Sequence, residues 1–253
     1  MKKRIKQLFD QKEKGICSIF ITAGFPEKES LLNLVPLLDK NGVDLIEIGI
    51  PFSDPLADGT TIQQSSEVAL KNGMNLLLLF EQLKELRKST EVPIVLMGYF
   101  NPIFQFGLEA FLERCQQVGV DGVIIPDVSF ELYHSHYEVL FEQFEVPLIF
   151  LASANNPERI VQIDQKSKAF IYLLSSASIT GKQNTFSAEQ LDAFKDVREL
   201  NLKSPVLLGF GIHNRETVKI AHHYFEGSII GSAFIRALEN KKPVQEFLQR
   251  VGY

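Results

Sequence analysis

The chain has 253 residues, 45% of them hydrophobic, which is enough to bury the core of one barrel-sized domain. Its formal net charge of −5 is spread over interspersed acidic and basic residues, which excludes a basic face for nucleic acid and a cationic stripe for a membrane. Cys17 and Cys115 form no C-x-x-C motif, and no apolar run is long enough to span a bilayer. We therefore expect a cytoplasmic protein whose partners are small molecules or proteins.

Short apolar segments alternate with longer amphipathic ones from the first residues to the last. A helix over 3–14 comes first and is expected to cover one end of the fold. Eight apolar runs predict strands: 17–22, 44–50, 93–99, 121–127, 147–153, 169–175, 205–211 and 227–232. Amphipathic patterns predict helices at 31–40, 76–88, 108–117, 132–144 and 216–225.

This alternation predicts an α/β fold, a closed (β/α)₈ TIM barrel with an extra N-terminal helix, as a single domain over residues 1–253. An open doubly wound sheet is the alternative. Such a sheet is expected to carry G-x-G-x-x-G after its first strand, whereas this chain has Thr22-Ala23-Gly24-Phe25-Pro26 there. The barrel is therefore preferred.

Glu47 is a carboxyl group inside an apolar strand, with Ile46, Ile48 and Ile50 around it. A buried carboxylate without a partner costs several kcal/mol, so either a cation pairs with it or its pKa rises. None of the eight strand runs contains a lysine or an arginine. This favours a catalytic acid/base role over a structural ion pair.

Further polar residues follow the strands, where barrel enzymes carry their chemistry. Asp58 precedes a helix expected near Thr60, so it fits an N-cap as well as a catalytic group, and Asp54 fits a turn or a protein contact. Asp127 and Tyr172 are expected at the barrel mouth, although Tyr172 also fits an ordinary core aromatic. The residues leave these alternatives open.

Glycines cluster after the last strands, at Gly209, Gly211 and Gly231, with Ser232 opening a helix and Gly181 in the sixth loop. Such glycines let backbone N–H groups approach an anion at a helix start, but they also permit close packing of helix on strand. We expect a phosphorylated substrate. The segment 175–187 is long and rich in small polar residues, which favours a mobile lid over a connector.

Two other chemistries find little support in the sequence. The histidines at 134, 136, 222 and 223 lack ligand spacing, so no metal site is expected. Lys182 lies in a polar loop rather than in the apolar pocket that a Schiff-base lysine needs.

The segment EIGIPFSDPLADG, Glu47 to Gly59, closely resembles the signature of the tryptophan synthase alpha chain family. Further matches extend over essentially the whole chain: MGYFNP at 97–102, GVDGVIIPD at 119–127, YLLS at 172–175, ITG at 179–181, GFGI at 209–212 and GSA at 231–233. The resemblance implies a (β/α)₈ barrel and a lyase of tryptophan biosynthesis. Such a lyase cleaves indole-3-glycerol phosphate to indole and glyceraldehyde 3-phosphate by acid/base retro-aldol chemistry.

The resemblance also assigns roles to residues of this chain. Glu47 is implied as the general acid/base, Asp58 as the acceptor of the indole N–H, and Tyr172 as the active-site tyrosine. The remaining implied positions are Phe20, Ile124, Phe210 and Ile229 for the indole pocket, Gly181, Gly211, Gly231 and Ser232 for the phosphate, and Thr180 for the lid. The lid departs from the usual S-R-A-G-V-T-G at Ser176 and Ser178.

The resemblance implies a partner as well, a pyridoxal-phosphate-dependent beta chain in an alpha2beta2 heterotetramer. Asp54 and Asn101 fall in segments that face it. No cofactor is expected in this chain itself. Two alternatives are a subunit that mainly binds and regulates the beta chain, and a phosphosugar isomerase on the same barrel.

Overall fold

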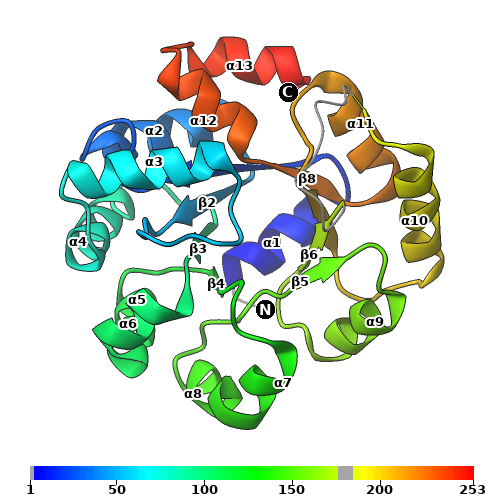
Figure 1. Cartoon of the computed structure of the whole chain (residues 1–253), viewed down its shortest axis with the longest axis horizontal. Helices are drawn as coiled ribbons and strands as arrows, with labels where there is room; N and C mark the ends of the chain where they lie inside the picture. The colour runs from blue at the N-terminus through cyan, green and yellow to red at the C-terminus, as the bar shows by residue number, and fades with distance from the viewer. Residues whose placement is uncertain (1–2, 176–184) are drawn as a thin grey trace.

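The computed structural model describes residues 3–175 and 185–253, which form a barrel of parallel strands surrounded by helices (Figure 1). The strands are β1 Ile16–Thr22, β2 Leu45–Gly49, β3 Ile94–Met97, β4 Gly122–Ile124, β5 Leu151–Ser153, β6 Ile171–Leu174, β7 Val206–Gly209 and β8 Gly227–Ile230. Their order is β4-β3-β2-β1-β8-β7-β6-β5, and an isolated parallel bridge between Val123 of β4 and Leu148, three residues before β5, joins the two ends of the sheet. The predicted TIM barrel and its eight strands are confirmed.

The helices are α1 Lys3–Gln11, α2 Ser30–Lys40, α3 Thr60–Lys71, α4 Leu76–Leu86, α5 Phe100–Phe106, α6 Leu108–Gln117, α7 Phe130–Leu132, the π-helix η1 Tyr133–Tyr137, α8 Glu138–Gln143, α9 Pro157–Lys166, α10 Ala188–Glu199, α11 Arg215–Tyr224, α12 Ser232–Glu239 and α13 Val244–Val251. Within the described ranges, no helix is both long enough and apolar enough to cross a membrane.

The helix predicted over 132–144 is not one regular α-helix, because a π-helical turn interrupts it. The hydroxyl of Ser135 hydrogen-bonds to the carbonyls of Glu131 (2.8 Å) and Leu132 (3.2 Å). It therefore competes with backbone N–H groups for these carbonyls, as serine side chains inside helices do. The spacing of apolar residues, from which the helix was predicted, carries no information about such side-chain hydrogen bonds.

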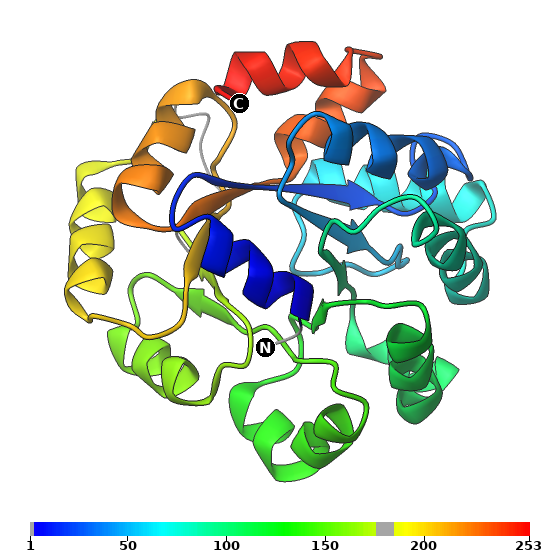
Figure 2. The same ribbon diagram turned by 180° about the vertical axis from the view of Figure 1, so that it is seen from behind.

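Helix α1 covers the amino end of the barrel, as predicted, and Figure 2 shows it lying across that end. Its side chains Ile5, Leu8 and Phe9 pack onto the barrel interior, and the Phe9 and Phe170 rings lie 6.1 Å apart. This end is thus closed by apolar packing, which leaves the carboxyl ends of the strands as the open mouth.

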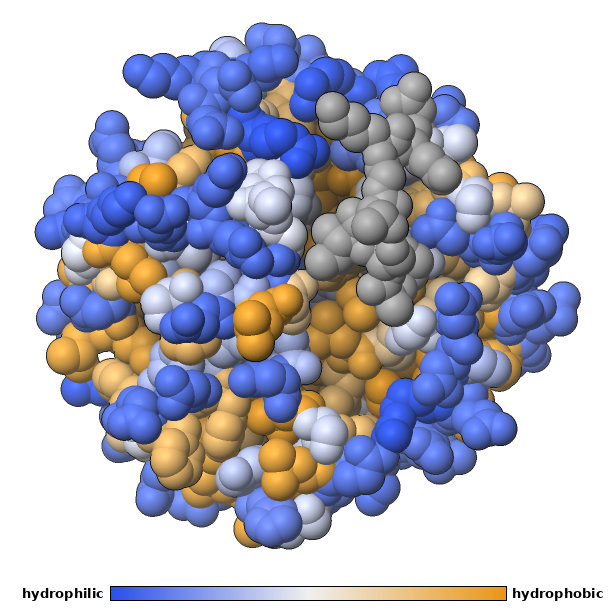
Figure 3. All heavy atoms as spheres, in the orientation of Figure 1, coloured by the Kyte–Doolittle hydropathy of each residue, from blue (hydrophilic) through white to orange (hydrophobic). Residues whose placement is uncertain are grey.

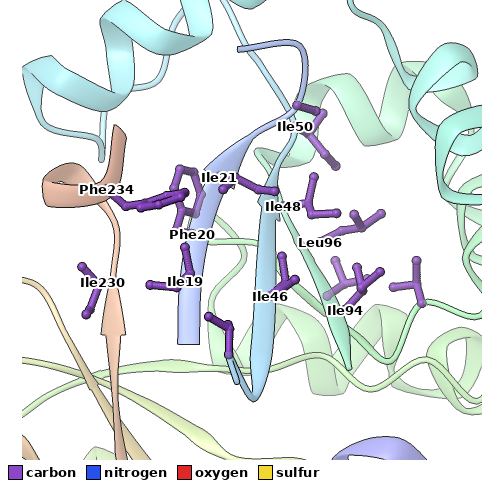
Figure 4. Close-up of a cluster of buried hydrophobic side chains, with 14 of the residues drawn as sticks. Ile19, Phe20, Ile21, Ile46, Ile48, Ile50, Ile94, Leu96, Ile230 and Phe234 are labelled. Atoms are coloured by element: carbon purple, nitrogen blue, oxygen red, sulfur yellow. The ribbon is translucent and has the colours of Figure 1, made fainter. Parts of the chain in front are cut away.

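Alternate strand residues face two different clusters. The outer cluster lies between strands and helices and includes Ile46 and Ile48 of β2, and Figure 4 shows these with their neighbours from β1 and β3. The inner cluster fills the barrel and includes Ile16, Leu45, Val95, Ile124, Ile149, Tyr172, Leu207 and Ile229. Glu47 stands between Ile46 and Ile48, so its side chain faces the barrel interior.

Candidate active site

A cavity of about 280 Å³ opens at the carboxyl ends of the strands, where the sequence predicted the site. Figure 3 shows this face of the molecule, with apolar surface near its centre. The lining residues are Phe20, Asp58, Gly59, Ile62, Met97, Tyr172, Ser175, Thr185, Phe186, Gln190, Phe210, Gly211, Ile212, His213, Ile229, Gly231, Ser232, Ala233 and Arg236. The lining therefore has an aromatic and aliphatic part and a polar part made of glycines, hydroxyls and one arginine.

Glu47 lies level with Phe20 of β1 and Val95 of β3, and its side chain has 0% exposure. One carboxyl oxygen, Oε1, accepts a hydrogen bond from the Ser18 hydroxyl at 3.0 Å, whereas Oε2 has no partner among the described residues. Burial raises the pKa of Glu47 to about 8, against the smaller opposing effect of the Ser18 hydrogen bond. In the described chain no lysine or arginine pairs with Glu47, so the alternative of a structural ion pair is not supported.

Asp58 lies in the loop between β2 and α3 and lines the cavity. Burial raises its pKa to about 6, while a hydrogen bond from Tyr99 acts in the opposite direction. The N-cap alternative for this residue is wrong. Helix α3 does begin at Thr60 as predicted, but its N-cap is Gly59 and no side chain caps it. The carboxylate of Asp58 instead accepts the Tyr99 hydroxyl at 3.1 Å.

Tyr172 projects from β6 into the barrel interior and lines the cavity with 5% exposure. Burial raises the pKa of its phenol well above the usual value, and the nearby carboxyls of Glu47 and Asp58 raise it further. The phenol is therefore neutral at any physiological pH. Its ring lies against Gly209 of β7, where an added Cβ would come within 2.3 Å of it. Gly209 thus makes room for the tyrosine.

Three of the four residues expected in the apolar wall line the cavity: Phe20, Phe210 and Ile229. The fourth, Ile124, does not. It is fully buried in the inner cluster with Tyr172 and Ile229. Phe210 packs edge-on against Tyr172 with the ring centroids 6.4 Å apart. The wall is therefore a continuous apolar surface beside the two carboxyl groups.

The polar side of the cavity combines the loop after β7 with the start of α12. Gly211, Gly231 and Ser232 all line it, as predicted from the glycine pattern. Phe210 and Gly211 have φ of 61° and 75°, so two successive residues are left-handed, a turn that exposes backbone N–H groups. Helix α12 begins at Ser232, where its first N–H groups lack intrahelical partners. This side suits an anion.

A cluster of three or more histidine, cysteine or acidic side chains able to hold a metal ion is absent from the part of the chain that the structure describes. The arrangement as it stands offers two carboxyl groups of different pKa, a neutral phenol, an apolar wall and an anion-binding end.

Comparison with known proteins shows to which family a chain with this site belongs. Residues 5–251 match a family described as "Tryptophan synthase alpha chain". The chain is 50% identical over 229 residues to the tryptophan synthase alpha chain of Flavobacterium psychrophilum, covering 90% of each, and 48% identical over 251 residues to that of Christiangramia forsetii, covering 98% of each. This chain belongs to the tryptophan synthase alpha chain family.

Solved structures of the family superpose on it closely. The alpha subunit of tryptophan synthase from Legionella pneumophila gives a TM-score of 0.84 at 30% identity, covering 98% of this chain and 94% of that one. The tryptophan synthase complex from Pyrococcus furiosus gives 0.82 at 34% identity, covering 94% and 96%. As a member of this family, the chain has the barrel that the resemblance implied.

Other residues that the sequence singled out, by the resemblance or, for Asp127, by its place at a strand end, lie away from the cavity. Asp54 and Asn101 are exposed, Asp54 on the loop after β2 and Asn101 in the first turn of α5. Asp127 does not point into the mouth, because its carboxylate accepts the Phe100 N–H at 2.9 and 3.1 Å and so holds the start of α5. Thr180 and Gly181 lie outside the described residues.

Two residues at this site were not identified from the sequence. Tyr99 contacts Asp58, and the motif MGYFNP that contains it was noted only as a family match. Arg236 lines the polar side of the cavity, one turn after Ser232, and its Nη1 donates to Thr61 Oγ1 at 3.2 Å. Among the described residues no carboxylate pairs with Arg236. A cation one turn beyond a glycine-serine helix start was the signal available for it.

Proposed function

We propose that this chain is the lyase component of a tryptophan synthase, cleaving indole-3-glycerol phosphate to indole and glyceraldehyde 3-phosphate in tryptophan biosynthesis. One observation carries the proposal beyond family membership. A fully buried carboxyl, Glu47, with a pKa of about 8 pairs in register with Phe20, which lines the cavity together with Asp58, a carboxyl with a pKa of about 6; Glu47 itself is not among the lining residues. Between these values Glu47 is protonated while Asp58 is charged, which gives an acid and an anion at the same pH.

Glu47 is the proposed general acid and base. Its proton goes to C3 of the indole, which leaves a positive charge on the ring. The glutamate carboxylate then takes the proton of the hydroxyl on the adjoining glycerol carbon as the carbon–carbon bond breaks, so it ends protonated as it began. The unpartnered Oε2 is the atom available for this exchange. Burial keeps the proton on Glu47 at neutral pH until substrate arrives.

Asp58 is the proposed acceptor of the indole N–H. Protonation at C3 develops positive charge at the ring nitrogen, and a nearby carboxylate stabilises that charge more strongly in the transition state than in the ground state. The apolar wall of Phe20, Phe210 and Ile229 would hold the ring, with Tyr172 close enough to both carboxyls for each to raise its pKa.

The polar side is the proposed phosphate site. Gly211, Gly231 and Ser232 present backbone N–H groups and a hydroxyl, and Arg236 adds a positive charge at the same end. By the family resemblance Gly181 would complete this site and Thr180 would act in the lid.

We further propose that the chain, acting as one domain over residues 1–253 in the cytoplasm, pairs with a beta chain in an alpha2beta2 assembly. Asp54 and Asn101, both exposed at the mouth face, support a contact there. The pyridoxal phosphate of such an assembly would belong to the beta chain, and this chain would need no cofactor of its own.

The test is indole release from indole-3-glycerol phosphate by the purified chain, alone and with a beta chain, with Asp58→Asn in parallel. We expect indole from the parent, more with the partner, and at least a hundredfold less from the variant. No indole from the chain, alone or with the beta chain, together with a raised turnover of the beta chain on added indole, would favour a regulatory subunit. Turnover of a ketose phosphate without indole release would favour the isomerase.

A further inference from the structure

Tyr99 connects two loops of the barrel mouth that are distant in sequence. It follows β3 and directly precedes α5, it has 8% exposure, and its ring packs against Phe52 with centroids 5.4 Å apart. Its hydroxyl oxygen accepts the backbone N–H of Ala57 at 2.9 Å and lies 3.1 Å from Oδ2 of Asp58. The phenol therefore reaches the loop between β2 and α3 rather than the cavity.

These two contacts determine where the phenolic proton goes. A tyrosine hydroxyl has one proton to donate, and Ala57 supplies a donor, so the proton of Tyr99 is directed to the Asp58 carboxylate. The backbone on the other side is held as well, because Asp127 accepts the N–H of Phe100, the next residue. The hydroxyl is thus fixed from the loops after β2, β3 and β4 together.

The contact engages only one oxygen of Asp58. Oδ2 accepts Tyr99, while Oδ1 accepts no hydrogen bond from the described residues. Asp58 itself lines the cavity, but Tyr99 does not. A carboxylate held by one oxygen cannot rotate freely about its χ2 bond, so the other oxygen keeps one direction.

We propose that Tyr99 is a positioning residue for the cleavage reaction: its hydroxyl holds Oδ2 of Asp58 so that Oδ1 faces the indole N–H. This inference rests on the proposed function, since it assigns the geometry of a group that the cleavage needs. Tyr99 acts through Asp58 and touches no substrate atom.

The pH dependence of activity reports on this role. The charged and titratable groups around Asp58 are Tyr99 after β3, Glu47 on β2, Tyr172 on β6, Asp127 behind Tyr99, and His213 and Arg236 on the polar side of the cavity. Among these, the Tyr99 hydrogen bond favours the charged form of Asp58 against the effect of burial. Without the hydroxyl, the pKa of Asp58 rises, and the acidic limb of kcat/KM moves to higher pH.

The experiment compares Tyr99→Phe with Tyr137→Phe in indole release over pH 5–9. Both variants lose only a phenolic oxygen, and Tyr137 packs against Phe100, next to Tyr99, without a hydrogen bond to Asp58. In Tyr99→Phe we expect kcat to fall about tenfold, with a smaller change in KM, and the acidic limb to rise by about one pH unit. Tyr137→Phe keeps the parental profile.

A double-mutant cycle separates positioning from a general structural role. In an Asp58→Asn background the Tyr99→Phe change should cost less than twofold, because the group on which Tyr99 acts is already lost. A tenfold loss in both backgrounds, or an unmoved acidic limb in an active Tyr99→Phe, would overturn this inference alone. A parent chain that releases no indole even with a beta chain would overturn the proposed function and this inference with it.

Discussion

Asp121 and Glu47 are both buried carboxyl groups of the barrel, Asp121 at the amino end of β4 and Glu47 in the middle of β2, with β3 between the two strands. Asp121 has 1% exposure and accepts Arg87 at 2.7 Å, Arg4 at 3.2 Å and the N–H of Ile94 at 3.0 Å. Glu47 has 0% exposure and one neutral donor, Ser18. The negative charge of Asp121 is thus balanced by two arginines and a backbone N–H, whereas a charge on Glu47 would have a single neutral hydrogen-bond donor.

This difference shows that the buried carboxyl at the amino end of the barrel serves stability, whereas the one nearer the mouth is available for catalysis. At the amino end, the buried charge is paired and hydrogen-bonded, so it ties β3, β4 and α1 together. Nearer the mouth, Glu47 has no charged partner, so burial raises its pKa and it remains a proton donor at neutral pH. A buried acid contributes to stability where partners surround it and becomes available for chemistry where they are absent.

The largest effect that tests this comparison is expected from Glu47→Gln. The amide keeps the shape and the acceptor for Ser18 but carries no transferable proton, so indole release should fall more than about 1000-fold. The free energy of unfolding at pH 7 should be no lower than that of the parent, because no ion pair is lost. Indole assays and urea titrations measure the two quantities. Activity within about tenfold of the parent would remove Glu47 as the acid/base.

The matched change at the other end, Asp121→Asn, should have the opposite result. It leaves Arg87, whose side chain is 10% exposed, without its charge partner, so the free energy of unfolding should fall by about 3 kcal/mol. Turnover per folded molecule should stay within about twofold, since Asp121 lies at the end away from the cavity. Urea denaturation and indole release at 25 °C measure both. Unchanged stability would show that the Arg87 pair contributes nothing net.

Much of this contrast was predictable from the sequence. The eight strands follow from short apolar runs bounded by helices, and Glu47 is conspicuous because a charge inside such a run requires an explanation. The glycines after β7 and β8 likewise predicted the polar side of the cavity. These signals are local, so one stretch of chain carries each of them.

The parts that sequence reasoning missed depend on contacts between distant residues. Asp58 looked like an N-cap because Thr60 follows, yet its carboxylate goes to Tyr99, 41 residues further on. Asp127 looked like a mouth residue, yet it holds the Phe100 N–H. A polar side chain at a loop has several partners within reach, and only the assembled barrel selects among them.

The last expected effect, the smallest per unit change in conditions, is the pH dependence of the free energy of unfolding that Glu47 contributes. Its pKa in the folded chain is about 8, against an ordinary value of 4.5, so between these values the folded state binds the proton more tightly than the unfolded one. The contribution of Glu47 to the free energy of unfolding is therefore fully present below about pH 4.5 and is lost as the pH rises from there through 8, by about 1.4 kcal/mol per unit. Other groups titrate too, but they are common to parent and Glu47→Gln.

The difference in unfolding free energy between parent and Glu47→Gln, measured by urea titration from pH 5 to 8, isolates this contribution. We expect the free energy of unfolding of the variant to rise relative to that of the parent over this range, by at most about 1.4 kcal/mol for each pH unit, because only the parent carries the titrating carboxyl. A constant difference would mean that Glu47 titrates normally in the folded chain. The contrast with Asp121 would then lose its electrostatic basis, and the proton that the cleavage needs would have to come from another group.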